Sequence, residues 1–230
     1  MTAEIPVVLL PGMNCTPRLW APVLPALRGR TVHHGELLGA SLEQCVENLL
    51  AVLPERFALA GLSLGGIVAM ALLRTAPERV DRLCLLDTNA RAPEPVQLAA
   101  FARQRRRLAT GASAQEVQRE LLDVLVHPRH LSRLGREVVR MGEETGVDSL
   151  AQQYAIQGTR RDERDHLPGI GVPVSVVAGR DDALCPPERH EEITALVPDA
   201  TLRLIPRTGH LSPLESPTEV AKSLVAWLER

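Results

Sequence analysis

Short apolar runs alternate along this chain with longer segments in which apolar residues recur at helical spacing. This alternation is typical of a parallel sheet whose two faces are covered by helices. We expect strands at residues 5–10, 31–34, 57–60, 82–87, 174–178 and 201–205. The pattern therefore predicts an α/β fold with a mostly parallel sheet of about six strands and helices on both faces.

Two of the predicted helices have clear start signals. Ser41 and Gln44 have the spacing of a capping box, which satisfies free N–H groups at the start of a helix that runs to about residue 53. Ser216 is expected to open the last helix in the same way, with Pro217 at the first helical position. Both helix starts are therefore well signalled in the sequence.

The alternation breaks between residues 89 and 168, where four helical patterns follow one another without a convincing strand. They cover residues 95–108, 114–125, 128–144 and 148–158. An all-helical insertion at the carboxyl ends of parallel strands covers the crevice in which such sheets bind ligands. We therefore expect a core domain of residues 1–88 and 169–230, and an inserted helical cap of residues 89–168.

The composition fits one globular domain, or one domain that carries an insertion. The 230 residues are 45% hydrophobic and 23% charged, which is enough apolar material to bury a substantial core. A net charge of −2 argues against a nucleic-acid-binding surface. Lys222 is the only lysine, a bias that we attribute first to the composition of the genome and only second to function.

The cysteines and the N-terminal residues favour a cytoplasmic protein. Cys15, Cys45, Cys84 and Cys185 lie far apart and form no C-x-x-C pair, so they indicate neither a zinc site nor a redox motif. The sequence starts without a basic, apolar leader, and no segment reaches the roughly 18 apolar residues that a membrane span needs. We therefore expect a cytoplasmic protein without a membrane or nucleic-acid partner, and its oligomeric state stays open.

Ser63 lies at the centre of a G-x-S-x-G sequence, between the apolar run of residues 57–60 and a run of small residues that starts at Gly65. This is the pattern of a nucleophile elbow, a sharp strand-to-helix turn that exposes a serine hydroxyl. A serine is a poor nucleophile by itself and needs a neighbouring base and backbone donors for the oxyanion. The alternative is a serine N-cap in an ordinary glycine-containing loop.

A base for Ser63 is expected in a loop at the same edge of the sheet. His210 fits this position, because it follows the apolar run of residues 201–205 and precedes the last helix. The other histidines that we compared with it lie within strands, on helices or beside helices: His33, His34, His127, His130 and His190. We therefore expect His210 to be the base.

The carboxylate that holds such a base is expected at the end of another strand. Asp181 and Asp182 follow the buried run that ends at Gly179, and either can reach the imidazole Nδ1. The carboxylate fixes the tautomer and stabilises the imidazolium that forms. We favour Asp182, and Asp181 is then expected to bind amides of its own loop.

Two backbone N–H groups are expected to form the oxyanion hole. One is the N–H of Leu64, which follows the nucleophile and starts a helix whose partial positive charge favours an anion. The other is the N–H of Met13 in the loop after the first strand, where Gly12 allows a close approach of the backbone. A plain Pro-Gly turn is the alternative for that loop.

With Ser63, Asp182 and His210 in this order, the chain resembles the α/β-hydrolase superfamily over nearly its full length. The matching sequences are Pro11-Gly12, the elbow of residues 61–66, the G-x-x-D of residues 179–182 with its proline at 186, and Gly209-His210. The spacing within the G-x-x-D sequence and its following proline is what selects Asp182. Within the superfamily, the chain is most similar to small capped bacterial carboxylesterases.

The chain departs from the family pattern in the loop after the first strand. Pro11 stands where relatives usually carry a histidine, so a side-chain hydrogen bond that steadies this loop is missing while the backbone donor remains. We also expect the chain to lack the edge strands that many relatives have before the first of these strands.

The residues and the resemblance together imply a serine hydrolase that cleaves a carboxylic ester through an acyl-enzyme on Ser63. Its substrate is then a small-molecule ester, and the reaction needs neither a metal nor an organic cofactor. The same three residues also suit a thioesterase. A third possible function is that of a ligand-binding protein that keeps the α/β-hydrolase fold.

A lyase or synthase of the menaquinone-pathway or hydroxynitrile-lyase type is a further alternative. Arg103, Arg107 or Arg140 in the cap can then clamp a substrate carboxylate. Phe101 and Tyr154 are the only aromatic residues of the cap. We therefore expect a pocket walled by Leu, Val and Ala rather than one built for ring stacking.

Overall fold

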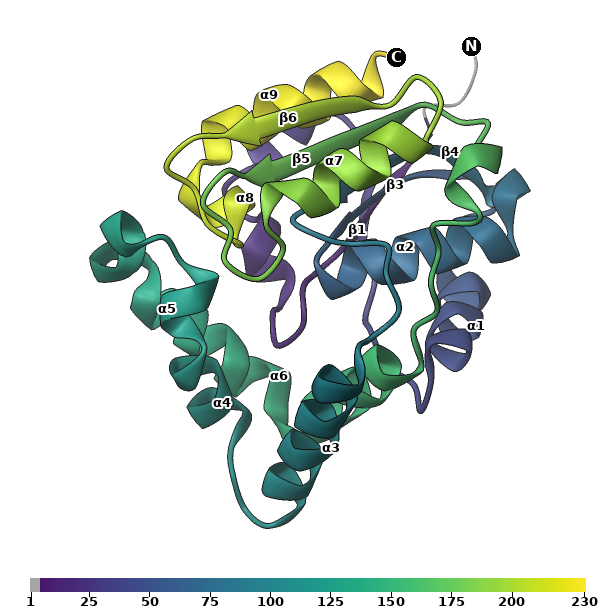
Figure 1. Ribbon diagram of the computed structural model, residues 1–230. Helices are drawn as coiled ribbons and strands as arrows, with labels where there is room; N and C mark the ends of the chain where they lie inside the picture. The colour runs from purple at the N-terminus through teal and green to yellow at the C-terminus, as the bar shows by residue number, and fades with distance from the viewer. Residues whose placement is uncertain (1–4) are drawn as a thin grey trace.

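The computed structural model describes residues 5–230, and six parallel strands form its single sheet (Figure 1). The strands are β1 (Val7–Leu10), β2 (Val32–His34), β3 (Phe57–Leu62), β4 (Val80–Leu86), β5 (Val174–Gly179) and β6 (Thr201–Ile205). Their order in the sheet is β2-β1-β3-β4-β5-β6. The predicted fold class is confirmed, and every pairing described is parallel.

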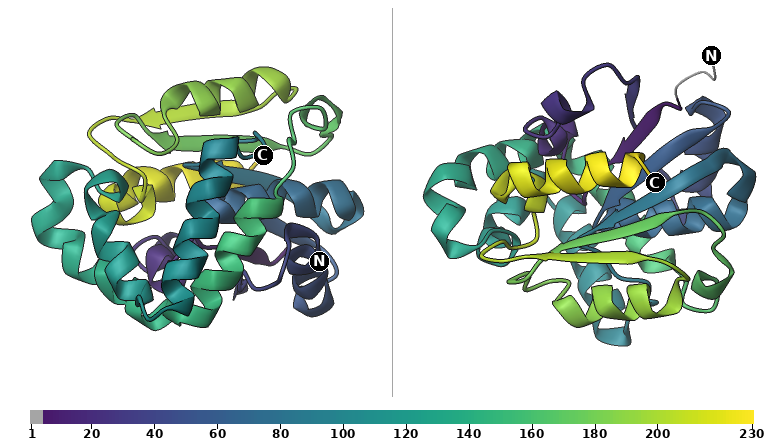
Figure 2. Two further views of the ribbon diagram at one scale, coloured as in Figure 1. Left: turned by 60° about the horizontal axis from the view of Figure 1, so that its bottom comes forward. Right: turned by 90° about the horizontal axis from the view of Figure 1, so that it is seen from above.

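Helices cover both faces of this sheet because successive strand residues point to opposite sides. In β1, Val8 and Leu10 join the apolar cluster of one face, whereas Val7 and Leu9 join that of the other. The first face is covered by α1 (Leu42–Val52), α2 (Leu64–Thr75) and α7 (Pro187–Leu196). The second is covered by α9 (Pro217–Leu228), which lies across the sheet from α7 (Figure 2).

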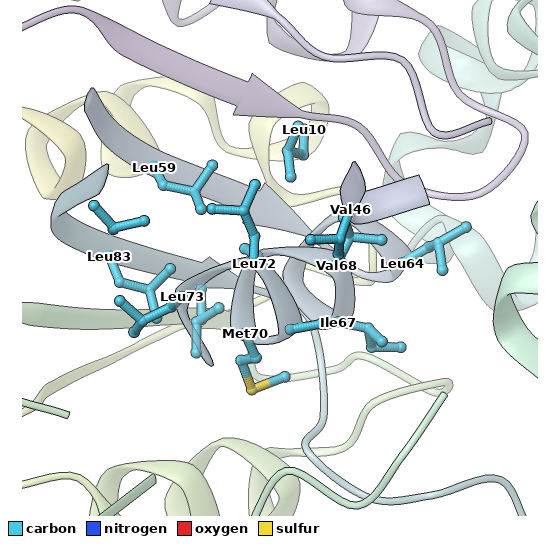
Figure 3. Packing of buried hydrophobic residues seen from close by; sticks show 14 of the residues in the cluster. Leu10, Val46, Leu59, Leu64, Ile67, Val68, Met70, Leu72, Leu73 and Leu83 are labelled. Carbon is cyan, nitrogen blue, oxygen red and sulfur yellow. The ribbon is translucent and has the colours of Figure 1, made fainter. Parts of the chain in front are cut away.

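Helix α2 is almost entirely buried, and its apolar residues fill the space between the sheet and α1 (Figure 3). Leu64, Val68 and Leu72 pack with Leu10 and Leu59 in the same cluster. Burial on all sides explains why this helix reads as a run of small and apolar residues without a polar face. It is therefore held firmly at the end of β3.

The chain between β4 and β5 is helical, as the sequence predicts, and contains no strand. It forms α3 (Pro95–Ala109), α4 (Ala114–Glu120), α5 (Leu122–Leu125) and α6 (Leu131–Thr159), and α3 and α6 lie side by side (Figure 2). The two helices predicted at residues 128–144 and 148–158 are arms of α6, which is kinked at Gly146 (φ 76°, ψ 167°). The helix predicted at 114–125 is divided at Leu121 into α4 and α5.

Short helical turns connect several of these elements. They are η1 (Pro17–Trp20), η2 (Leu24–Leu27), η3 (Pro77–Arg79), η4 (Pro128–His130) and η5 (Leu167–Gly169), and a short helix α8 (Ser212–Glu215) precedes α9. Within residues 5–230, no helix is both long enough and apolar enough to cross a bilayer.

The prediction for Ser41 is confirmed, and that for Ser216 is confirmed in part: Ser216 precedes α9, whose first residue is Pro217, but its side chain makes no capping hydrogen bond. The Ser41 hydroxyl accepts a hydrogen bond from Gln44 N at 3.2 Å at the start of α1. The Ser216 hydroxyl instead lies 2.7 Å from the Thr208 hydroxyl and caps nothing. Because α8 ends immediately before α9, Ser216 already donates its own N–H to Ser212 O and has no extended cap conformation.

The turn from β3 into α2 is tight enough to require glycine at three positions. A Cβ on Gly61 would lie 2.2 Å from the carbonyl oxygen of Gly65, and one on Gly65 would lie 2.4 Å from that of Leu10. A Cβ on Gly66 would lie 2.7 Å from side-chain atoms of Thr88 at the end of β4. These glycines let α2 start directly against the carboxyl ends of the central strands.

We predict that Gly66→Ala destabilises the protein by about 1–3 kcal/mol, because the added methyl group overlaps Thr88. Gly158→Ala is the matched control, since Gly158 also lies in a helix but has no atom within 4 Å of the added carbon. It should stabilise the protein by about 0.5–1 kcal/mol. Urea unfolding measures both changes, and equal effects of the two substitutions would contradict the assigned packing.

Candidate active site

Ser63 occupies the single residue between β3 and α2. Its backbone has φ 54° and ψ −116°, a conformation that is costly for any residue other than glycine. Its N–H donates to Leu86 O at 2.9 Å, and its carbonyl accepts from Gly66 N at 2.9 Å and from the Thr88 hydroxyl at 2.8 Å. The surrounding bonds thus hold the turn in a conformation that projects the side chain from the sheet edge.

The structure brings together three of the side chains that the sequence singles out. His210 Nε2 lies 2.8 Å from Ser63 Oγ, and His210 Nδ1 lies 2.7 Å from Asp182 Oδ2. The other oxygen of Asp182 accepts from the N–H groups of Leu184 at 2.8 Å and Cys185 at 3.0 Å. Asp181, the alternative aspartate, is exposed and donates its N–H to Thr208 O.

His210 lies in an environment that favours its protonated form. Burial alone disfavours the imidazolium, but the negative charge of Asp182 and the hydrogen bond to it outweigh burial, so the pKa of His210 is raised above its usual value. The imidazole and the carboxylate are both almost completely buried. This arrangement suits a group that accepts a proton and must stabilise the resulting charge.

Glu215 of α8 fixes the backbone on either side of His210. This buried carboxylate accepts from Gly209 N at 2.9 Å and from Leu211 N at 3.1 Å, and it also accepts from His127 N at 2.9 Å. Nothing in the sequence spacing of Glu215 distinguishes it from an ordinary helix glutamate, so the sequence does not predict this role.

Asp87, at the end of β4, connects the loops that carry the acid and the histidine. It is fully buried, its Oδ1 accepts from Gly179 N at 2.8 Å, and its Oδ2 accepts from the Ser212 hydroxyl. Burial and the neighbouring charge of Asp182 hold the pKa of Asp87 well above the usual range of a carboxyl group. A second buried acid therefore lies beside the Asp182–His210 pair, and the sequence gives no sign of it.

His190 has a structural place rather than a catalytic one. It is buried on α7, and its Nε2 accepts from Thr88 N at 2.8 Å. Burial lowers the pKa of His190 to about 4, so the ring is neutral at neutral pH. It supports Thr88, which in turn binds the carbonyl of Ser63.

The two backbone groups expected at the oxyanion hole lie at the same edge of the sheet. Leu64 is the first residue of α2, where N–H groups have no partner within the helix. Gly12 and Met13 line the same cavity as Ser63. Asn14 ties this loop to the helical segment, since its N–H donates to Gln153 Oε1 at 2.7 Å and its Nδ2 donates to Ala114 O at 2.9 Å.

A cavity of about 250 Å³ opens beside Ser63 and His210, between the strand ends and α3, α4, α5 and α6. The expectation of Leu, Val and Ala walls holds only in part: five leucines and Ala100 line the cavity and no valine among residues 5–230 does, but both aromatic residues of the helical segment, Phe101 and Tyr154, line it too. Polar side chains also line it: Gln97, Gln104, Gln118, Gln157 and Arg160. The arginines named for a lyase lie elsewhere: none of the three lines the cavity, and Arg107 and Arg140 pair with Glu120 and Glu144.

The acid, the histidine and Cys185 offer three atoms that lie within 4.8 Å of one another and are of the types that bind metals. Burial raises the pKa of the Cys185 thiol to about 12, so the thiol stays protonated at neutral pH, whereas a metal ligand must be a thiolate. Asp182 and His210 are already hydrogen-bonded to each other. The arrangement therefore suits proton transfer better than metal binding.

We predict that the stability contributed by Asp87 depends on pH in the direction opposite to that of an ordinary carboxylate. The pKa of Asp87 is raised in the folded protein. Its contribution to stability is therefore fully present below about pH 3.9, the ordinary pKa of an aspartate in an unfolded chain, and is lost as the pH rises through the pKa of Asp87 in the folded protein. Urea unfolding of wild type and Asp87→Asn between about pH 5 and pH 8 tests this. The stability advantage of wild type should shrink with rising pH, and a constant or growing advantage would refute it.

The chain resembles known proteins over nearly its whole length. The model of the alpha/beta hydrolase family matches residues 7–223. A pimeloyl-[acyl-carrier protein] methyl ester esterase of Aromatoleum aromaticum is 32% identical, and the match covers 94% of each chain. A putative carbamate hydrolase of Azorhizobium caulinodans is 28% identical over 90% of this chain and 85% of its own.

A solved structure has the same fold throughout. A thermophilic esterase of Thermogutta terrifontis, determined with malate bound, superposes with a TM-score of 0.88 at 26% identity. The superposition covers 98% of this chain and 89% of that chain. The similarity therefore extends to the helical segment as well as to the sheet.

Proposed function

The chain belongs to the α/β-hydrolase family, and from that membership we propose that it is a serine hydrolase that cleaves carboxylic esters. Two of the proteins that it resembles over nearly their full length are described as esterases. The substrate is a small-molecule ester, and the acyl group is transferred first to Ser63 and then to water.

The first half of the reaction forms the acyl-enzyme. His210 Nε2 takes the proton of Ser63 as Oγ attacks the ester carbonyl, and a tetrahedral oxyanion forms. The N–H groups of Leu64 and Met13 stabilise this oxyanion. When the intermediate collapses, the carbon–oxygen bond to the alcohol breaks, and the imidazolium returns its proton to the leaving oxygen.

The second half releases the acid and restores the enzyme. His210 now removes a proton from water, which attacks the acyl carbon bound to Ser63. The second tetrahedral intermediate collapses, the bond to Oγ breaks, and Oγ recovers its proton from His210. Asp182 keeps the imidazole in the tautomer that faces Ser63 and stabilises its charge in both halves.

One observation supports this proposal above all others: the continuous hydrogen-bonded series from Ser63 Oγ through His210 to Asp182, with distances of 2.8 Å and 2.7 Å. The strained backbone at Ser63 adds to it, because such strain concentrates at functional sites. We further propose that residues 89–168 act as a cap that encloses the substrate over these groups.

We predict that Ser63→Ala abolishes hydrolysis of a p-nitrophenyl acyl ester while the melting temperature and circular dichroism stay close to those of wild type. The substitution removes the nucleophile and its hydrogen bond to His210 but keeps the Cβ and the backbone bonds of the turn. Mass spectrometry of wild type during turnover should show an acyl adduct on Ser63. Full activity of Ser63→Ala would refute the proposal, and turnover without any adduct would favour a lyase.

We also predict different effects at the two neighbouring aspartates. Asp182→Asn should lower kcat by about 10⁴-fold, because the imidazole loses its correct tautomer. Since Asp182 raises the pKa of His210, and the neutral ring is the base, any residual activity should persist to lower pH than in wild type. Asp181→Asn is the control and should change neither kcat nor the pH dependence of the activity. Equal effects of both substitutions would contradict the assignment of Asp182.

A further inference from the structure

Arg160 is the most deeply buried arginine among residues 5–230, and it lines the cavity beside Ser63. It follows the last turn of α6 and is only 7% exposed. Its Nε donates to Arg91 O at 3.1 Å, Nη1 donates to Gln157 Oε1, and Nη2 donates to Gln97 Oε1 at 3.1 Å. Its protein partners are therefore neutral, and two of its five N–H groups remain for another acceptor.

Acidic residues near Arg160 in the sequence are bound to other arginines. Glu163 pairs with Arg74 at 3.0 Å, and Asp162 pairs with Arg164 at 2.6 Å. No carboxylate within the described residues lies at ion-pair distance from Arg160, and none of the residues that line the cavity is acidic. A buried cation without a counterion is costly, and burial lowers the pKa of Arg160 accordingly.

The neighbouring Arg161 has the opposite environment. It is exposed and pairs with Glu43 at 3.0 Å, on the outside of the molecule. The three neutral acceptors around Arg160 instead hold its guanidinium in place without neutralising it. This is the environment expected where a ligand, and not the protein, supplies the negative charge.

A second polar side chain in the cavity also has an unused donor. Gln118 on α4 is 1% exposed and lines the cavity, and its Nε2 has no hydrogen-bond partner within the described part of the chain. Buried donors of this kind are normally satisfied. The cavity therefore offers donors from α4 and from the end of α6, beside the apolar surface of Phe101 and Leu121.

We propose that the ester hydrolysed at Ser63 carries a free carboxylate, and that Arg160 binds this carboxylate within the cavity. This inference rests on the proposed function and specifies its substrate class. The two remaining N–H groups of a planar guanidinium suit the two oxygens of a carboxylate, and one cation balances its single charge. Both Arg160 and Ser63 line a cavity of about 250 Å³, so a short chain separates the carboxylate from the ester.

Two matched pairs of neutral and charged esters test the proposal. Monomethyl glutarate against methyl pentanoate places the charge on the acyl part, and 4-acetoxybutanoate against butyl acetate places it on the alcohol part. In at least one pair, wild type should prefer the charged ester by about tenfold or more in kcat/KM, the size of effect expected from charge-assisted hydrogen bonds. A preference for the neutral ester in both pairs would overturn the proposal.

Substitution of the arginine should remove that preference. In Arg160→Gln, the ratio of kcat/KM for the charged ester to that for its neutral partner should fall by about tenfold to a hundredfold. In Arg160→Lys, which keeps the charge but loses the planar pair of donors, the ratio should fall less. Arg161→Gln is the matched control and should keep the wild-type ratio. An unchanged ratio in Arg160→Gln would refute the role of this residue.

A binding measurement separates this inference from the proposed mechanism. Glutarate should raise the melting temperature of Ser63→Ala, which has no nucleophile, and should not raise that of the double variant with Arg160→Gln. Inorganic phosphate, tested in parallel, should give a smaller shift. Equal melting-temperature shifts by glutarate in Ser63→Ala and in the double variant would overturn the carboxylate site, even if Ser63 proves to be the nucleophile. If glutarate raises the melting temperature of Ser63→Ala only, and Ser63→Ala keeps full esterase activity, the proposed mechanism is refuted but the carboxylate site is not.

Discussion

The position of one buried imidazole is the constraint on which the rest of this structure depends. His210 lies between a hydroxyl on one side and a carboxylate on the other, and an almost fully buried ring forms its charged state at low cost only when that carboxylate is close. Parallel strands make this possible, because their carboxyl ends lie at one edge of the sheet. β3 ends at Ser63, and the loops after β5 and β6 carry Asp182 and His210.

Two further carboxyl groups hold the loops after β5 and β6 in position relative to each other. Asp87 bonds to the ends of both the acid and histidine loops, and Glu215 binds the N–H groups on either side of His210. Neither touches Ser63 by a hydrogen bond in the described structure. Their contribution is to remove freedom from backbone that would otherwise be loop, so that the geometry of Ser63, His210 and Asp182 is set by the protein fold itself.

Local patterns in the sequence are sufficient for the sheet, the elbow and the family, and the structure and the comparisons confirm the fold and the membership. The G-x-S-x-G spacing and the apolar runs act over a few residues, so they can be read directly. Four residues cannot be found in this way: Asp87, Glu215, Asn14 and Arg160. Asp87, Asn14 and Arg160 act through partners more than 60 residues away in the sequence. Glu215 acts through a loop that only the tertiary fold assembles around it. Ser216 shows the converse limit: its local pattern correctly places the start of α9, but with α8 directly before it the serine side chain forms no capping hydrogen bond.

The kink of α6 has a consequence for how the helical segment is attached to the sheet. The arm before Gly146 packs through Leu134 and Val138 on the cluster of the second sheet face, whereas the arm after it packs through Ile156 on the cluster of the first. A single residue with backbone freedom thus separates two firmly anchored halves of one helix. Because its two arms pack on different faces of the sheet, this one helix attaches the helical segment to both layers of the core, and the arm after Gly146 brings Tyr154 into the cavity wall.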